Sequence, residues 1–233
     1  MALYTIGDTH LSLGAQKPMD VFGGVWRNYE EKLRQSLTDL LTEEDVLVIA
    51  GDFSWGMSLE EALPDFRFLD QFPGKKVLLK GNHDYWWETV SKMQRFFEKN
   101  AINSLQFLHN NCIFYKGVAL CGTRGWFYDP AASQEDKIFR REVIRLEASL
   151  KAAREQDGGC QLICFLHYPP VFAGTEVPEI TRLLESYGVS QCYYGHLHGE
   201  SCRGAFNGRR GGVDYHLISA DYVQFRPVTI LDK

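Results

Sequence analysis

Leu78-Leu79-Lys80-Gly81-Asn82-His83-Asp84 joins the end of an apolar run to a glycine and three polar residues. A short apolar run bounded by glycine predicts a buried strand. The polar residues that follow are an amide, an imidazole and a carboxylate. Because sites in open α/β sheets form just beyond the carboxyl ends of strands, this stretch predicts a strand that delivers polar side chains to a site.

The same arrangement occurs elsewhere in the chain. The other apolar runs and the polar residues after them are Leu3–Ile6 before Asp8-Thr9-His10, Val46–Ala50 before Gly51-Asp52, Leu162–Leu166 before His167, and Gln191–Tyr194 before His196-Leu197-His198. Apolar residues at helical spacing predict helices within residues 29–41, 90–97, 138–150 and 178–187. Alternating strands and helices predict an α/β fold with mostly parallel sheets.

The last third of the chain has a different pattern. Residues 201–206, 213–219 and 227–231 resemble strands of an antiparallel edge, and residues 207–212 resemble a hairpin turn. Residues 13–26 and 124–135 fit neither pattern. Both stretches follow predicted strands, so we expect loops over the site.

The composition is that of an ordinary globular protein. The chain has 233 residues, of which 45% are hydrophobic, and its net charge is -5. We expect one domain over residues 1–233, without the basic face that nucleic-acid binding favours. We also expect no signal peptide, no membrane span and a cytoplasmic location. The six cysteines form no Cys-x-x-Cys pair, which favours reduced, partly buried thiols. The oligomeric state stays open.

Histidine is concentrated at the predicted strand ends. Five of the seven histidines lie there, and we expect the other two, His109 and His216, to be structural. Asp8 and His10 are two residues apart, so on an extended chain both side chains leave the same face and can reach one metal ion. The strand-end histidines are His10, His83, His167, His196 and His198.

Three further residues add ligand and proton-transfer chemistry. The Asp52 carboxylate has two oxygens and can bridge two cations, although an aspartate there can also cap a helix. Asn82 offers an amide oxygen to a metal, and His83 offers a proton. Asp84 can accept a hydrogen bond from the His83 ring and orient it.

In this order, these motifs resemble the signature of calcineurin-like metallophosphoesterases. The segments 19–23, 51–55 and 122–126 also resemble a bacterial group of predicted phosphohydrolases. The resemblance implies a β-sandwich of two mixed sheets flanked by helices, with His83 as general acid facing the leaving group. It implies two metal sites that share Asp52. Their ligands would be Asp8, His10, Asp52 and His198 for one ion, and Asp52, Asn82, His167 and His196 for the other.

The chemistry of phosphoryl transfer agrees with such a site. Two cations can clamp the attacking and leaving oxygens, and a water between them loses a proton near neutral pH and becomes the nucleophile. Mixed imidazole, carboxylate and amide ligands favour Mn or Fe, with Zn, Co or Ni as alternatives. We therefore predict hydrolysis of a small phosphorylated substrate.

Other activities fit the sequence less well. Protein serine/threonine phosphatases of this superfamily carry Gly-Asp-x-x-Asp-Arg-Gly, whereas this chain has Gly51-Asp52-Phe53-Ser54-Trp55-Gly56. The difference favours the phosphodiesterase-like branches and leaves the choice between monoester and diester open. A phosphoprotein phosphatase and a non-catalytic scaffold are the alternatives. Metallo-β-lactamase and nucleophile-elbow motifs are absent from the sequence.

The substrate-binding residues are predicted from fewer features. Trp55, Trp86 and Trp87 follow the motifs and can stack on a base or sugar, although core packing is the favoured interpretation. Arg124 can bind a phosphate oxygen or form a surface salt bridge.

Overall fold

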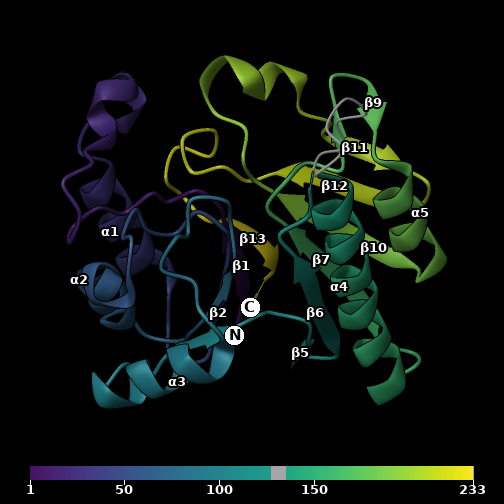
Figure 1. Ribbon diagram of the computed structural model, residues 1–233, viewed down its shortest axis with the longest axis horizontal. Helices are drawn as coiled ribbons and strands as arrows, with labels where there is room; N and C mark the ends of the chain where they lie inside the picture. Colours follow the sequence, from purple (N-terminus) through teal and green to yellow (C-terminus); the bar gives the residue numbers. More distant parts are fainter. Residues whose placement is uncertain (127–134, 233) are drawn as a thin grey trace. The chain divides into compact units, whose positions relative to one another are not determined.

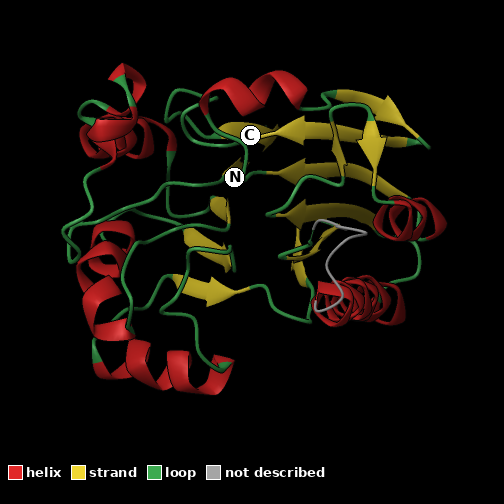
Figure 2. Cartoon of the chain, turned by 45° about the horizontal axis from the view of Figure 1, so that its top comes forward, coloured by secondary structure: helices red, strands yellow, loops and turns green. Residues whose placement is uncertain are grey.

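The computed structural model describes residues 1–126 and 135–232 (Figure 1). The chain divides into two compact units. The first unit comprises Met1–Phe107 and Ile218–Lys233, and the second comprises Leu108–Leu217. Each unit contains one large mixed sheet with helices along it, coloured yellow and red in Figure 2.

The sheet of the first unit has five strands in the order β13-β1-β2-β3-β4. Strands β1 to β4 are parallel, and β13 is antiparallel to β1. Parallel pairing brings the carboxyl ends of β1, β2 and β3 to one edge of the sheet, where their motifs follow. The strand bounds are Leu3–Ile6 (β1), Val46–Ala50 (β2), Lys75–Leu79 (β3), Leu105–Phe107 (β4) and Val228–Leu231 (β13).

Three α-helices and two short 3-10 helices belong to the first unit. Alternate strand residues such as Leu47 and Leu78 pack with Leu37 of α1, Phe66 of α2 and Phe97 of α3 in one core. Burial of these apolar side chains is the main term that stabilises the unit. The helix bounds are Met19–Phe22 (η1), Gly24–Trp26 (η2), Tyr29–Leu40 (α1), Leu59–Asp70 (α2) and Val90–Lys99 (α3).

The large sheet of the second unit has six strands in the order β11-β12-β10-β7-β6-β5. The central strands β12, β10, β7 and β6 are parallel, and the edge strands β11 and β5 are antiparallel to their neighbours. Strands β8 and β9 form a small separate hairpin. The strand bounds are Ile113–Tyr115 (β5), Val118–Thr123 (β6), Gln161–Leu166 (β7), Val171–Phe172 (β8), Thr175–Glu176 (β9), Val189–Tyr194 (β10), Gly208–Arg210 (β11) and Val213–Leu217 (β12).

Helices α4 (Glu135–Gln156) and α5 (Pro178–Ser186) lie along one face of this sheet (Figure 1). Leu146 and Leu150 of α4 and Leu184 of α5 pack with Cys164 and Leu166 of β7 in the core of the second unit. A 3-10 helix, η3 (Gly199–Gly204), follows the last predicted motif.

The predicted fold class, α/β with two mixed sheets flanked by helices, is confirmed. The five strand-end motifs all follow strands, and the predicted helices coincide with α1, α3, α4 and α5. Helix α2 was not predicted. Among the described helices, none has the length and apolar character needed to cross a membrane.

The strand predicted over residues 201–206 is wrong, because the chain there forms η3. The Ser201 hydroxyl accepts a hydrogen bond from the His198 N–H and donates one to the His198 carbonyl, both at 2.8 Å. Such local side-chain bonds compete with strand pairing. Strand β11 lies within residues 207–212, which were predicted as a hairpin turn. Of the other two predicted edge strands, β13 is antiparallel to β1, whereas β12 is antiparallel to β11 and parallel to β10.

The six cysteines are free thiols, and four of them are buried. Burial raises the pKa of Cys121 and Cys164, which keeps these thiols protonated. The predicted loop over residues 124–135 lies largely outside the described residues, which resume at Glu135 with α4.

Candidate metal and catalytic residues

The first unit presents four predicted ligands after three parallel strands. Asp8 and His10 follow β1, Asp52 follows β2, and Asn82 follows β3. Asp8, His10 and Asp52 have positive φ angles of 56°, 46° and 49°. Few non-glycine residues adopt this left-handed conformation, and such strain is concentrated at functional sites. All three side chains are nearly fully buried.

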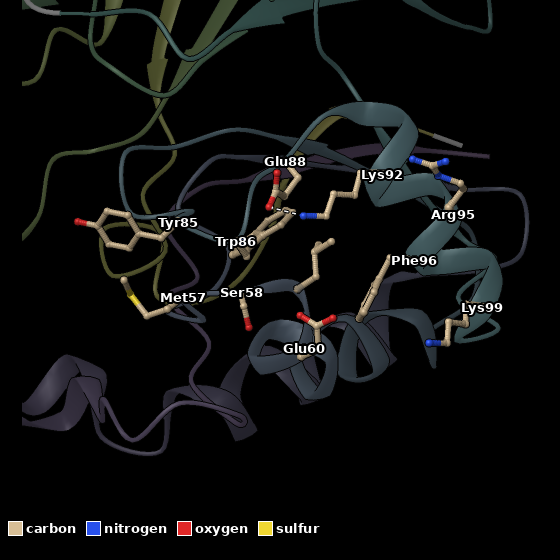
Figure 3. Close-up of a pocket in the computed structure, with 11 residues that line it drawn as sticks. Met57, Ser58, Glu60, Tyr85, Trp86, Glu88, Lys92, Arg95, Phe96 and Lys99 are labelled. Carbon is tan, nitrogen blue, oxygen red and sulfur yellow. Dashed lines mark hydrogen bonds and ion pairs between the residues drawn. The ribbon is translucent and has the colours of Figure 1, made fainter.

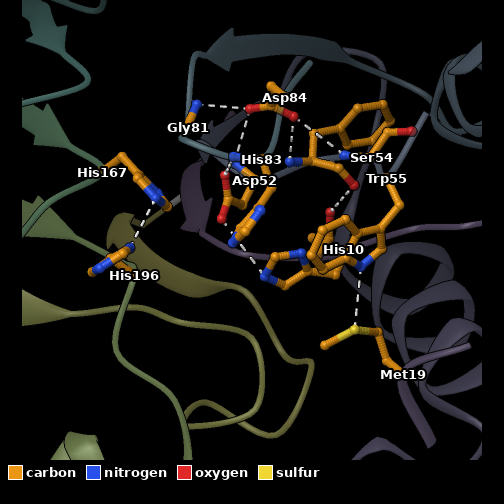
Figure 4. Close-up of polar contacts among 12 residues, drawn as sticks. His10, Met19, Asp52, Ser54, Trp55, Gly81, His83, Asp84, His167 and His196 are labelled. Atoms are coloured by element: carbon orange, nitrogen blue, oxygen red, sulfur yellow. Dashed lines mark hydrogen bonds and ion pairs between the residues drawn. The ribbon is translucent and has the colours of Figure 1, made fainter. Parts of the chain in front are cut away.

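Three of these side chains lie close together in the first unit, and Figure 4 shows His10 and Asp52 next to each other. Candidate ligand atoms of Asp8 lie within 4.8 Å of those of His10 and Asp52. The His10 Nε2 atom is 3.8 Å from an Asp52 carboxylate oxygen. The other Asp52 oxygen accepts a 2.7 Å hydrogen bond from the His83 N–H, which fixes the carboxylate relative to the motif after β3.

His83 is half-buried beside two aromatic rings. Its ring centroid is 4.5 Å from that of Trp55 and 5.8 Å from that of His10. Trp55 stacks on His10 at 4.9 Å and donates its indole N–H to the Met19 sulfur. The Trp26 ring also contacts His10 in an edge-to-face arrangement, with the centroids 5.9 Å apart. Residues 13–26, predicted as a loop, contain η1 and η2, and Trp26 at their end contacts a predicted ligand. The position of this segment over the site stays a prediction.

Asp84 connects the loops that carry these residues. Its buried carboxylate accepts hydrogen bonds from the N–H groups of Asp52 and Phe53 at 2.9 Å, Ser54 at 3.3 Å and Gly81 at 2.7 Å. The Trp86 indole N–H adds a fifth bond at 3.0 Å. The hydrogen bond expected from the His83 ring to Asp84 stays a prediction. Asp84 thus holds the loops after β2 and β3 together.

Gly81 lies directly against Asp52 of the neighbouring loop. A Cβ atom added at this position would be 2.1 Å from Asp52 Oδ1 and 2.2 Å from the Asp52 backbone nitrogen. Only glycine fits without displacing the carboxylate.

The second unit presents three predicted ligands, all histidines. His167 follows β7 and is fully buried, and His196 follows β10 with a positive φ of 72°. The His196 Nδ1 and His167 Nε2 atoms are 3.3 Å apart (Figure 4). Two nitrogens bound about 2.1 Å from one tetrahedral ion lie roughly 3.4 Å apart, so this pair has the spacing of two ligands to one metal. His198 precedes η3 and is half-buried.

Arg124 follows β6, next to β7 in the same sheet. Its carbonyl accepts hydrogen bonds from the N–H groups of His167 and Tyr168 at 3.0 and 2.9 Å. Its guanidinium stacks on Trp126 at 4.5 Å and lies 3.6 Å from the carboxylate of Glu142, a buried residue of α4. The salt bridge predicted as one alternative for Arg124 therefore exists, but its acidic partner Glu142 is buried and not on the surface.

Two carboxylates near the predicted residues were not identified from the sequence. Asp65 of α2 accepts hydrogen bonds from the Ser54 hydroxyl and, at 2.8 Å, from the Leu13 N–H. Burial raises its pKa to about 6. Glu142 also accepts a bond from the Thr123 hydroxyl at 2.6 Å. Each acid lies on an apolar helix face, and a charged residue in that position is the signal that could have revealed it.

Two further tryptophans and one histidine have structural surroundings. Trp86 and Trp87 are buried in the core, in agreement with the favoured interpretation. His216 stacks on Tyr193 at 4.9 Å, and burial lowers its pKa.

The donor set fits divalent metal ions. Each unit contains a buried histidine among its predicted ligands, and the first unit also has two carboxylates and the Asn82 amide. Mixed nitrogen and oxygen donors of this kind suit first-row transition metals.

Comparison with known proteins gives a family and a fold. The sequence model described as calcineurin-like phosphoesterase matches residues 1–200. Among curated protein sequences, none matches this chain. Three solved structures are similar over nearly their whole length. A protein of unknown function from Aquifex aeolicus is 16% identical, with 98% of this chain and 95% of the other covered and a TM-score of 0.51. Phosphopantetheinyl hydrolase from Mycobacterium tuberculosis is 13% identical, with 100% of this chain and 96% of the other covered and a TM-score of 0.61. TT1561 of Thermus thermophilus is 13% identical, with 98% of this chain and 97% of the other covered and a TM-score of 0.57. At these identities the likeness concerns the fold.

Proposed function

We propose that this chain, which belongs to the calcineurin-like phosphoesterase family, hydrolyses phosphate esters with two divalent metal ions. The ligands would be those that the motifs predict. Asp8, His10, Asp52 and His198 would hold one ion, and Asp52, Asn82, His167 and His196 the other. Mn or Fe is the expected metal.

The bound ions would supply charge neutralisation at the phosphoryl group and activate a water for attack. The protein positions its own groups around that chemistry. Asp84 fixes the loops of Asp52 and Asn82 through backbone hydrogen bonds. The carboxylate of Asp52 in turn holds the backbone of His83.

His83 would donate a proton to the leaving oxygen. Its half-buried ring lies against Trp55, beside His10, so it is fixed while part of it stays accessible. A positioned general acid typically contributes about 10²–10⁴-fold to the rate.

The observation that carries the proposal is the cluster of buried Asp8, His10 and Asp52 side chains. The candidate ligand atoms of His10 and Asp52 each lie within 4.8 Å of one of Asp8, and all three residues have a left-handed backbone. Three consecutive motif ligands of one unit adopt a conformation that costs about 1–3 kcal/mol per residue. Such strain is maintained where the direction of a side chain matters, and here these side chains are of metal-binding type.

Hydrolysis of small esters is favoured over phosphoprotein dephosphorylation. The segment after Asp52 is Phe53-Ser54-Trp55-Gly56 and has neither the Asp nor the Arg of the serine/threonine phosphatase motif. Trp55 instead packs on His10. A cytoplasmic location remains part of the proposal.

The test is turnover by the Mn²⁺-reconstituted protein on p-nitrophenyl phosphate and bis-p-nitrophenyl phosphate. We expect hydrolysis of at least one ester, and the preferred ester identifies monoester or diester chemistry. The His83→Ala variant should keep its metal, measured by mass spectrometry of the metals, and lose about 10²–10⁴-fold in kcat.

His109→Ala is the matched control, because His109 lies outside the motifs, and we expect its rate to stay within about twofold of wild type. Equal rates in wild type and His83→Ala would refute the assignment of His83. A metal-loaded protein that hydrolyses neither ester would favour the scaffold alternative.

A further inference from the structure

A groove of about 380 Å³ lies beside the predicted catalytic motif in the first unit (Figure 3). Its walls come from the start of α2, from α3 and from the residues that follow two motifs. Met57 comes five residues after Asp52, and Tyr85 comes directly after Asp84. Ligand sites typically have volumes of about 300–1,000 Å³, so the groove is large enough for part of a substrate.

One end of the groove is apolar and adjoins His83. Tyr85 is 52% exposed, and its ring centroid is 6.0 Å from that of His83. Met57 is 53% exposed and lies near Tyr85 at the same end (Figure 3). An exposed aromatic ring beside a flexible thioether suits a planar group such as a nucleobase.

The other end of the groove is basic. Arg95 and Lys99 are four residues apart on α3, so their side chains lie on one helix face (Figure 3). Both are exposed, and among residues 1–126 and 135–232 the structure gives neither a salt bridge. Lys92, on the same wall, is paired with Glu88 at 2.7 Å. Two cations on adjacent turns can bind one phosphate together.

The remaining charge in the groove does not neutralise this end. Glu60 lines the wall at the start of α2 and is one carboxylate against the two cations Arg95 and Lys99. The groove is therefore locally positive in a chain whose net charge is -5. Such a local field favours an anionic group over a neutral one.

We propose that this groove is a substrate subsite for a nucleoside phosphoester that carries a second phosphate. The inference rests on the proposed phosphoesterase function, which places the scissile phosphate near His83. The base lies against Tyr85 and Met57, and the second phosphate lies between Arg95 and Lys99.

The test compares adenosine 3′,5′-bisphosphate with adenosine 5′-monophosphate on the Mn²⁺-reconstituted protein. We expect kcat/KM to be about tenfold higher for the bisphosphate, because two charge-assisted contacts are added. In the Arg95→Gln/Lys99→Gln variant that advantage should fall to about twofold or less. Lys151→Gln/Arg182→Gln removes the same charge from the second unit and should keep the tenfold advantage.

Calorimetric titration with adenosine 3′,5′-bisphosphate separates this inference from the proposed function. If the bisphosphate binds wild type about tenfold more tightly than the groove variant, the subsite stands, even for a protein that hydrolyses no ester. If p-nitrophenyl phosphate is hydrolysed but both nucleotides behave alike, or the groove variant keeps the advantage, the subsite is refuted and the phosphoesterase remains.

Discussion

Asp84 and Glu142 are buried carboxylates, one in each unit, and each organises a predicted site segment by a different kind of contact. Asp84 accepts five N–H groups, of which four belong to the backbone. Glu142 contacts the guanidinium groups of Arg124 and Arg145, at 3.6 and 2.6 Å, and the Thr123 hydroxyl.

The two contact types have different consequences. Backbone donors cannot rotate away, so Asp84 fixes the path of two ligand loops. Guanidinium groups sit on long side chains that keep rotamer freedom, so Glu142 restrains Arg124 while leaving it able to adjust. The comparison implies that loss of Asp84 disturbs metal binding and folding, whereas loss of Glu142 disturbs substrate binding.

The largest effect is expected for Asp84→Asn. The amide places an N–H₂ group among N–H donors and leaves buried donors unsatisfied, so we expect the free energy of unfolding to fall by about 3 kcal/mol. Metal content and kcat should fall together. Urea denaturation and metal analysis of the purified variant measure both.

Asp70→Asn is the matched control. Asp70 is a half-buried carboxylate of the same unit that accepts hydrogen bonds from the N–H groups of Asn103 and Ser104. We expect a loss of about 1 kcal/mol with metal binding unchanged. If Asp84→Asn lost no more stability than Asp70→Asn and kept its metal, the backbone-anchor role of Asp84 would be wrong.

Glu142→Gln should have a smaller effect on a different quantity. The substitution removes the charge that restrains Arg124, so we expect KM to rise about three- to tenfold while kcat changes by less than twofold. Steady-state kinetics on the preferred ester measures the changes in KM and kcat separately.

Arg145→Gln removes the other guanidinium partner of Glu142 and should leave KM unchanged. A loss of kcat rather than a rise in KM in Glu142→Gln would show that α4 supports the catalytic residues themselves. Equal KM values in wild type and Glu142→Gln would remove Arg124 from substrate binding.

The positions of the predicted ligands could be read from the sequence because each follows a strand. The apolar runs at 3–6, 46–50 and 162–166 form strands β1, β2 and β7, and parallel pairing places the strand ends of each sheet at one edge. The strand prediction was wrong where side-chain hydrogen bonds between residues close in sequence decide the structure, as in η3. Helix α2 was missed although Ser58 caps it by accepting the Glu61 N–H.

The anchors of the site could not be predicted in the same way. Three of the five donors to Asp84 are backbone groups from a loop about 30 residues earlier, and no periodic pattern records such a contact. The strained φ angles at Asp8, His10 and Asp52 are equally invisible, since Asp and His are common in many loops.

Asp65 is a third buried carboxylate, and its predicted effect appears only when the pH is changed. Burial raises its pKa to about 6 in the folded state, above the ordinary value of 3.8. The folded state therefore holds this proton more tightly, so the stability it contributes is fully present below about pH 4 and is lost as pH rises through 6. Compared with Asp65→Asn, wild type should be more stable at pH 4 than at pH 7 by about 2 kcal/mol. Urea denaturation measures this difference, with a chelator present to remove the effects of metal binding. If the stability difference between wild type and Asp65→Asn were the same at pH 4 and pH 7, Asp65 would be ionised in the folded protein.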